Sequence, residues 1–266
     1  MGAAHLAEAG VEQAIREIAA DSTYVSLATD GLLTFYTSDG RPLPRLPRTR
    51  VRLGAGEFSY RITDEEARVN VNNVQQPVLD RLLQCLGIDK IARDEIVDSI
   101  LDWIDPNDDH RLNGAESDDY YLKLPTPYRA HNARLDSITE LLQVKGVTEA
   151  LFNGVDGKPG LADALSAKSP GSVNVNTAEP LVFCAMNISE AVISLISQGR
   201  RETPYPHTNI PGLPGGGFAV ITRTFRIEAE GLMDGRPRAS ITAIVQRRQG
   251  TGSGSPIVTL EWSGVR

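Results

Sequence analysis

The sequence predicts an α+β fold in which a helix and an antiparallel sheet are interrupted by a large helical insertion. The chain begins with a segment of helical period, and segments with the alternation of strands lie towards both ends. Between these segments the apolar residues recur at helical spacing. We therefore predict a helix-and-sheet domain formed by residues 1–63 and 207–266, with an α-helical insert at residues 64–206.

The first helix is predicted to begin at residue 3. Its apolar face contains Val11, Ala14, Ile15 and Ile18. The segment lacks the charged start and apolar core of a signal peptide, and the chain has no run of about 18 apolar residues that would cross a membrane. With 41% hydrophobic residues among 266, the chain is apolar enough to build a folded core.

Five segments are predicted to be strands because they are rich in β-branched residues or alternate in polarity. They are residues 31–38, 49–63, 217–233, 237–248 and 257–264. Asp234 and Gly235 lie between two of these segments and predict a hairpin turn, where positive φ values are needed. The segment RRQGTGSGSP is predicted to be a flexible connection before the last strand.

The insert is predicted to contain several helices. Two apolar stripes have helical spacing: Leu79, Leu82, Leu83 and Leu86, and then Ile96, Val97, Ile100, Leu101 and Ile104. Ser137 and Glu140 have the spacing of a capping box that opens the segment ITELLQV. Ser189 is predicted to start a further helix with the sequence EAVISLISQGRR.

The insert also contains a repeat. RVNVNNVQQPVLDRLLQCLG begins at Arg68 and SVNVNTAEPLVFCAMN begins at Ser172, and each runs from VNVN through a proline into a helix with one cysteine. The valines are predicted to be buried and the asparagines to hydrogen-bond the start of the next helix. The alternative is a helix-hairpin-helix unit of a DNA-binding or uptake protein. The net charge of −7 and the scarcity of glycines beside Lys or Arg in these turns disfavour nucleic acid as a partner.

An enzymatic function is not predicted. The four histidines lie in no HExxH or nucleophile-and-base motif, and the three glycines at 215–217 have no following lysine to form a phosphate-binding loop. The acidic residues crowd into one loop, whereas glycosidase carboxylates face each other across a cleft. A calcium-dependent hydrolase stays as a third alternative.

The acidic stretch DWIDPNDDHRLNGAESDDYY, which begins at Asp102, predicts a calcium site. Asp105, Asn107, Asp109, Asn113 and Glu116 fall at positions 1, 3, 5, 9 and 12 of a loop like an EF-hand, with the Arg111 carbonyl at position 7. His110 stands where such loops have glycine, so Asp102, Asp118 or Asp119 is expected to replace one of these ligands. Hard oxygen ligands favour Ca²⁺ over zinc or copper. The alternative is a solvated acidic loop.

Four fragments in order carry a resemblance to a known family. They are ITDEEARVNVN from Ile62, ILDWIDPNDDHRLNGAESDDYY from Ile100, PYRAHNARLDSITELLQVKGVT from Pro127 and SVNVNTAEPLVFCAM from Ser172. Together they resemble the K-type minor pseudopilin of the bacterial type II secretion system. The resemblance implies a pseudopilin fold, in which an N-terminal helix packs on an antiparallel sheet, with the helical domain inserted. It also implies a structural, non-enzymatic role at the tip of the pseudopilus together with the I-type, J-type and H-type minor pseudopilins.

The resemblance has further implications for location and binding. Family members are periplasmic and are anchored in the inner membrane by an N-terminal leader and apolar helix, which this chain lacks. They bind calcium in the inserted domain. Because disulfides persist in the periplasm, Cys85 and Cys184 are expected to be bridged, the alternative being two buried free thiols. Two cysteines at this spacing form neither a zinc site nor a CxxC motif.

The small residues of the first helix are the expected contact with partner subunits. Pseudopilins bundle through this helix, so Ala3, Ala7, Gly10 and Ala14 are expected to face the I-type and J-type subunits. The alternative is that this face packs only on the sheet of its own chain.

Overall fold

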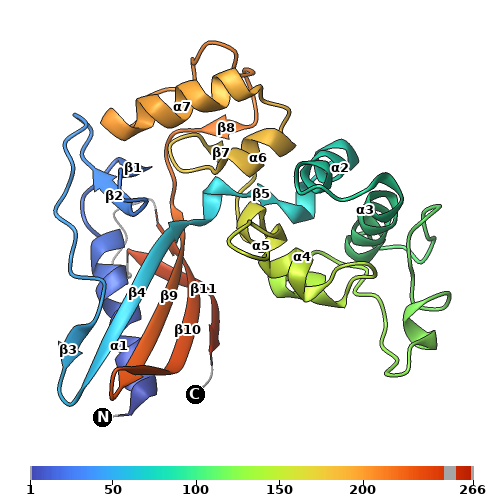
Figure 1. The fold of residues 1–266 in the computed structure, drawn as a ribbon, viewed down its shortest axis with the longest axis horizontal. Coiled ribbons are helices and arrows are strands. Elements are labelled where there is room, and N and C mark those ends of the chain that lie inside the picture. Colours follow the sequence, from blue (N-terminus) through green and yellow to red (C-terminus); the bar gives the residue numbers. More distant parts are fainter. Residues whose placement is uncertain (1, 249–255, 265–266) are drawn as a thin grey trace.

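The computed structural model describes residues 2–248 and 256–264. One helix, α1 (Ala3–Ile18), packs on an antiparallel sheet of five strands with the order β11-β10-β9-β4-β3. The strands are β3 (Val51–Leu53), β4 (Gly56–Asp64), β9 (Thr224–Met233), β10 (Arg236–Arg247) and β11 (Ile257–Gly264). Figure 1 shows α1 lying along one face of this sheet, and a hairpin of β1 (Tyr24–Leu27) and β2 (Leu33–Tyr36) follows the helix.

Each segment predicted to be a strand contains one, but residues 49–63 fold as the hairpin β3–β4, and residues 217–233 contain two separate strands, one at Phe218–Ala219 and β9. The structure also adds β1, which the sequence did not reveal. Asp234 and Gly235 form the turn between β9 and β10, with φ values of 53° and 72°, so this prediction is confirmed. Of the predicted Gly/Ser connection, residues 249–255 lie outside the described residues.

The segment between β4 and β9 is mainly helical. Its α-helices are α2 (Gln76–Cys85), α3 (Lys90–Ile104), α4 (Glu149–Asn153), α5 (Leu161–Ala164), α6 (Pro180–Ala185) and α7 (Glu190–Glu202). Its strands are β5 (Val69–Asn70), β6 (Leu165–Ser166), β7 (Val173–Asn174) and β8 (Phe218–Ala219), which form two short parallel pairs, β5–β6 and β7–β8. Short 3₁₀ helices lie at Glu65–Ala67, Val71–Asn73, Tyr121–Lys123 and Ile138–Gln143.

The predicted capping box of Ser137 and Glu140 is present, but it opens a 3₁₀ helix. This segment is only six residues long, and such short connections favour the tighter winding. Among the described residues, no helix is long and apolar enough to span a membrane.

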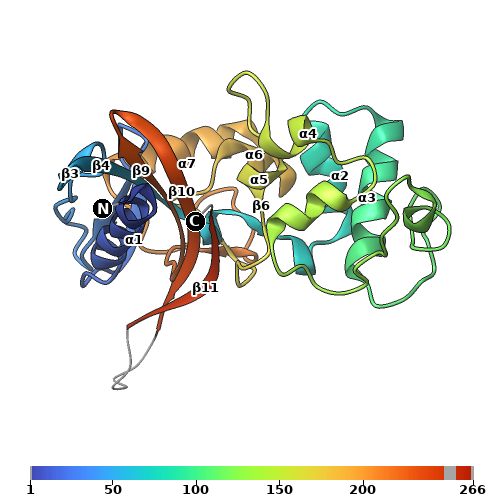
Figure 2. The same cartoon turned by 90° about the horizontal axis from the view of Figure 1, so that it is seen from below.

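The buried apolar residues form two separate clusters. One contains the α1 face and the sheet, including Val11, Ile62 and Ile227, and the other contains the helices of the insert, including Leu82, Ile100 and Phe183. Figures 1 and 2 both place the insert beyond one end of the sheet. The domain boundaries given above stay a prediction.

Candidate functional sites

The acidic loop follows α3 and lies at the end of the insert that is remote from the sheet, as the green segment of Figures 1 and 2 shows. It is tied to α3 through Asp102, whose side chain is fully buried in the last turns of that helix. Asp102 accepts hydrogen bonds from the backbone N–H groups of Arg111 (3.1 Å) and Ala115 (3.0 Å). A side chain at position 114 would collide with the Asp102 carboxylate, so the loop needs Gly114 there.

The guanidinium of Arg111 lies between two of the predicted calcium ligands. Its Nη1 is 2.6 Å from Asp102 Oδ1 and 2.6 Å from Asp105 Oδ2. Burial raises the pKa of Asp102, and the hydrogen bonds from Arg111 oppose that shift. The sequence had suggested only the backbone carbonyl of Arg111 as a ligand. In the structure its side-chain cation pairs with both carboxylates and balances one of their two negative charges.

Three other predicted ligand groups bond neighbouring residues, whereas the side chains of Asp109 and Asp118 are exposed. The Arg111 carbonyl accepts from the Gly114 N–H and lies 2.8 Å from His110 Nδ1, and Asn113 donates from its backbone and side chain to Asp98 Oδ2. Asn107 Oδ1 accepts from the Asp109 N–H. Within residues 2–248 and 256–264, no three His, Cys, Asp or Glu side chains gather closely enough to hold a metal ion.

Glu116 differs from these residues because it is buried without a partner. Its side chain is 2% exposed, and neither carboxylate oxygen accepts a hydrogen bond from a described residue. Burial is the main cause that raises the pKa of Glu116 to about 7. The nearby Asn132 side chain and Ser117 backbone oppose this shift, and the charges of Asp102 and Asp105 add to it. Its neighbour Asp119 accepts from the Glu116 N–H at 2.8 Å.

The sequence analysis missed two residues of this loop. Asp98 is buried one turn before Asp102 on α3, a helical spacing that could have pointed to it. Asn132 returns from a later loop, donates to the Asn107 carbonyl (3.0 Å) and to Asp108 (2.7 Å), and has a buried Oδ1 without a partner. No local pattern marks Asn132, because its position depends on the path of the chain.

The small residues of α1 face the sheet of the same chain. Ala7 and Ala14 are fully buried, and a side chain at Gly10 would meet Ala229 Cβ at 3.1 Å. Ala3 is half-buried, and its carbonyl approaches Gly231 on β9. The expectation that Ala7, Gly10 and Ala14 contact partner subunits is therefore wrong, because close packing of α1 on its own sheet covers them.

The two VNVN repeats have equivalent hydrogen bonds. The first asparagine of each, Asn70 or Asn174, accepts from the backbone N–H two residues later. The second asparagine joins distant segments: Asn72 bonds the N–H and carbonyl of Leu135, and Asn176 bonds those of Tyr205. Asn72 also donates to the carbonyl of Ala167, directly after β6, and Asn176 donates to that of Val220, directly after β8. The asparagines thus hold returning chain segments as well as helix starts.

Each repeat continues into a helix hairpin, and a disulfide joins the two. Cys85 at the end of α2 is bonded to Cys184 in α6, with Cα atoms 6.4 Å apart. The turns α2–α3 and α6–α7 have the same form, with a positive φ at Gly87 (81°) and Asn187 (62°). The N–H groups at the start of α3 are occupied by the Asp89 carboxylate, which leaves a negative charge where a DNA-binding hairpin would receive phosphate.

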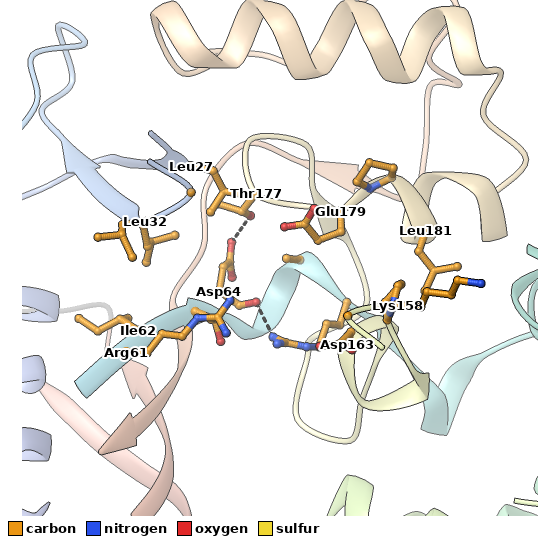
Figure 3. A pocket seen from close by; sticks show the side chains of 18 of the residues that line it. Leu27, Leu32, Arg61, Ile62, Asp64, Lys158, Asp163, Thr177, Glu179 and Leu181 are labelled. Atoms are coloured by element: carbon orange, nitrogen blue, oxygen red, sulfur yellow. Dashed lines mark hydrogen bonds between the residues drawn. The ribbon is translucent and has the colours of Figure 1, made fainter. Parts of the chain in front are cut away.

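A buried carboxylate, Asp64, lies where the sheet meets the insert. It ends β4, is 2% exposed, and accepts hydrogen bonds from the hydroxyls of Thr177 and Thr222, both 2.6 Å, and from the Asn174 amide at 2.8 Å. Figure 3 shows Asp64 beside Thr177 on the wall of a cavity of about 670 Å³. Arg61 and Leu32 line this cavity from the sheet side, and Glu179 and Leu181 line it from the insert.

Comparisons with known proteins agree with this architecture. Residues 60–156 match the family model described as type II secretion system (T2SS), protein K. Type II secretion system protein K of Pectobacterium carotovorum subsp. carotovorum is 33% identical over 121 residues, which cover 40% of this chain and 37% of that protein. The protein K of Klebsiella pneumoniae is 29% identical over 145 residues, covering 49% and 43%.

One solved structure shares the fold through most of the chain. It is the GspK-GspI-GspJ complex of the enterotoxigenic Escherichia coli type 2 secretion system, matched with a TM-score of 0.63 and 16% identity over 83% of this chain and 84% of that one. The fold is thus the pseudopilin fold with a helical insertion. The chain spans less than half the length of each of these two curated relatives. The family model and these relatives together show that residues 60–156 and the regions shared with these proteins are similar to type II secretion system protein K.

Proposed function

We propose that the chain acts as a minor pseudopilin at the tip of a type II secretion pseudopilus and supports protein export across the outer membrane. The observation that carries this proposal is the match to a chain of the solved GspK-GspI-GspJ complex over 83% of this chain, a share that neither the sheet nor the insert could supply alone. The buried carboxylates fit a structural role rather than catalysis, because Asp64 and Asp102 are occupied in holding chain segments together.

The proposed partners are the I-type, J-type and H-type minor pseudopilins. The matched structure is a complex of GspK with GspI and GspJ, which supports the first two. The proposed location is the periplasm, with the full-length protein anchored in the inner membrane by an N-terminal segment. A net charge of −7 and the acidic cap at the α3 hairpin argue against a nucleic-acid partner.

Complementation tests the proposed function. A secreting strain without its own K-type gene should retain the exported protein inside the cell, and the full-length gene from which this chain comes should restore export. As a control, cell lysis should be equal in both strains. Failure to restore export, with the protein present at normal level and its I-type and J-type partners taken from the same source, would reject the proposed role.

We further propose that the acidic loop binds Ca²⁺. The support comes from Glu116, because a buried carboxylate with no hydrogen-bond donor lacks the positive charge that its ionised form requires. Glu116 and Asn132 would supply oxygens to the ion, together with members of the predicted set. A calcium ion held by Asp102 and Asp105 would take over the charge-balancing role of Arg111, whose side chain is 37% exposed.

A further inference from the structure

Asp64 is held by four neutral hydrogen-bond donors that come from both sides of the junction. Its Oδ1 accepts from the Glu66 N–H (2.8 Å) on its own segment and from the hydroxyl of Thr222, which precedes β9. Its Oδ2 accepts from Asn174 and Thr177 of the second repeat. The carboxylate therefore links the end of β4 to the chain entering β9 and to the insert.

No cationic side chain among the described residues bonds this carboxylate. Arg68 Nη1 donates instead to the Asp64 backbone carbonyl (2.9 Å) and pairs with Glu65, which also pairs with Arg226 at 2.9 Å. Glu66 accepts from two backbone N–H groups that lead into β9. Four further charged residues line the adjoining cavity, namely Arg61, Lys158, Asp163 and Glu179. Ion pairing thus does not fix the ionisation of Asp64.

Both threonine hydroxyls have a second acceptor within reach. Thr177 Oγ1 lies 3.5 Å from the Asn174 carbonyl, and Thr222 Oγ1 lies 3.4 Å from the Thr224 carbonyl. If Asp64 takes up a proton, that proton can be donated to either threonine oxygen. The threonine hydrogen then turns to its backbone carbonyl, and the N–H groups of Asn174 and Glu66 keep their acceptors. Every polar atom of the junction stays satisfied in both forms.

We propose that Asp64 is a latch that holds the insert on the sheet in both its carboxylate and its carboxylic acid form, because either Thr177 or Thr222 can reverse its hydrogen bond when the carboxylate takes up a proton. This latch keeps the angle between sheet and insert constant across a change of pH.

Two variants that remove the hydroxyls test the latch. Burial is the largest influence on the pKa of Asp64 and raises it to about 6, while the hydrogen bonds from Thr177 and Thr222 oppose this shift. Because the pKa of Asp64 is higher in the folded protein than the 3.8 of the unfolded chain, its contribution to stability is fully present below pH 3.8. That contribution is lost as the pH rises through about 6. Without a hydroxyl the buried carboxylate loses a donor, so Thr177→Val or Thr222→Val should lower Tm roughly twofold more at pH 8 than at pH 5.

The controls separate this effect from lost packing. Thr259→Val, at an exposed position of β11, should change Tm equally at both pH values, and Thr177→Ser should restore most of the loss at pH 8 because it keeps the hydroxyl. In the unmodified chain, hydrogen exchange should show the amides of Val173 and Val175, which bond Gly217 and Ala219, equally protected at pH 5 and 8 after correction for intrinsic rates. Loss of that protection at either pH, or equal Tm losses for Thr177→Val at both, would overturn the proposal.

Discussion

Cys85 and Cys184 form a disulfide that joins the first helix of one VNVN repeat to the first helix of the other. The two cysteines are 99 residues apart in the chain, so the bond closes most of the insert into one loop. Arg81 of α2 strengthens the same contact by donating to the Ala185 carbonyl at 3.3 Å. The insert is thus covalently closed at the place where its two halves meet.

Reduction of this disulfide is expected to destabilise the insert. In the chain-entropy model, a loop of this length contributes roughly 4 to 5 kcal/mol. Urea unfolding with and without a reducing agent measures the difference, and the double variant Cys85→Ser/Cys184→Ser provides the control, since it should not respond to reductant. Two alkylatable thiols in the native oxidised protein would contradict the bridge.

Gly231 is expected to be essential for the contact between α1 and the sheet. A Cβ at this position would collide with the backbone of Ala3, so Gly231→Ala must push the start of the helix away from β9. We expect a loss of about 1–3 kcal/mol in the free energy of unfolding. Gly215→Ala is the matched control, because no atom lies within 4 Å of its new methyl group. Equal stability of the two variants would show that α1 does not pack as described.

Calcium is expected to raise Tm by mass action, and a chelator is expected to lower it. Glu116→Gln should remove most of this response because it deletes the unpaired buried charge. Asp156→Asn, an exposed position in a different loop of the insert, should leave the response intact. Binding is also measurable by the fluorescence of Trp103, which is buried against Tyr121 next to the loop. If calorimetry shows no heat at millimolar Ca²⁺, the loop does not bind calcium.

The stability of the calcium-free protein should depend on pH through Glu116. Burial raises its pKa from 4.5 to about 7, so its contribution to stability is present below pH 4.5 and is lost as the pH rises through about 7. The free energy of unfolding should therefore fall over this range, and Glu116→Gln should flatten this part of the curve. If the free energy of unfolding changes by the same amount between pH 4.5 and 7 in the wild type and in Glu116→Gln, Glu116 does not titrate as described.

Some elements could be predicted from the sequence because they depend on local rules. The period of α1, the stripes of α2 and α3, and the Asp234–Gly235 turn follow from neighbouring residues alone. The short parallel pairs β5–β6 and β7–β8 escaped prediction because two-residue strands have no period to detect. The direction of the small α1 residues could not be settled either, since small size permits close packing on any neighbour.

The acidic loop shows how far a binding site can be predicted from the sequence. The spacing from Asp105 to Glu116 describes only positions along the chain. It does not reveal that the Arg111 side chain lies between the carboxylates of Asp102 and Asp105 in the folded loop. The buried position of Glu116 and the return of Asn132 to the loop depend on tertiary contacts. Pattern counting found the acidic loop but not its internal contacts.

Sedimentation velocity with the I-type and J-type pseudopilin domains from the same source tests the central claim most directly. At about 10 μM of each chain, a concentration well above a micromolar Kd, the account predicts one faster species that contains all three proteins. An unrelated periplasmic protein of similar size should leave the boundary of this chain unchanged. If the chain sediments alone while the I-type and J-type domains are folded and present in excess, it is not the K subunit of their complex.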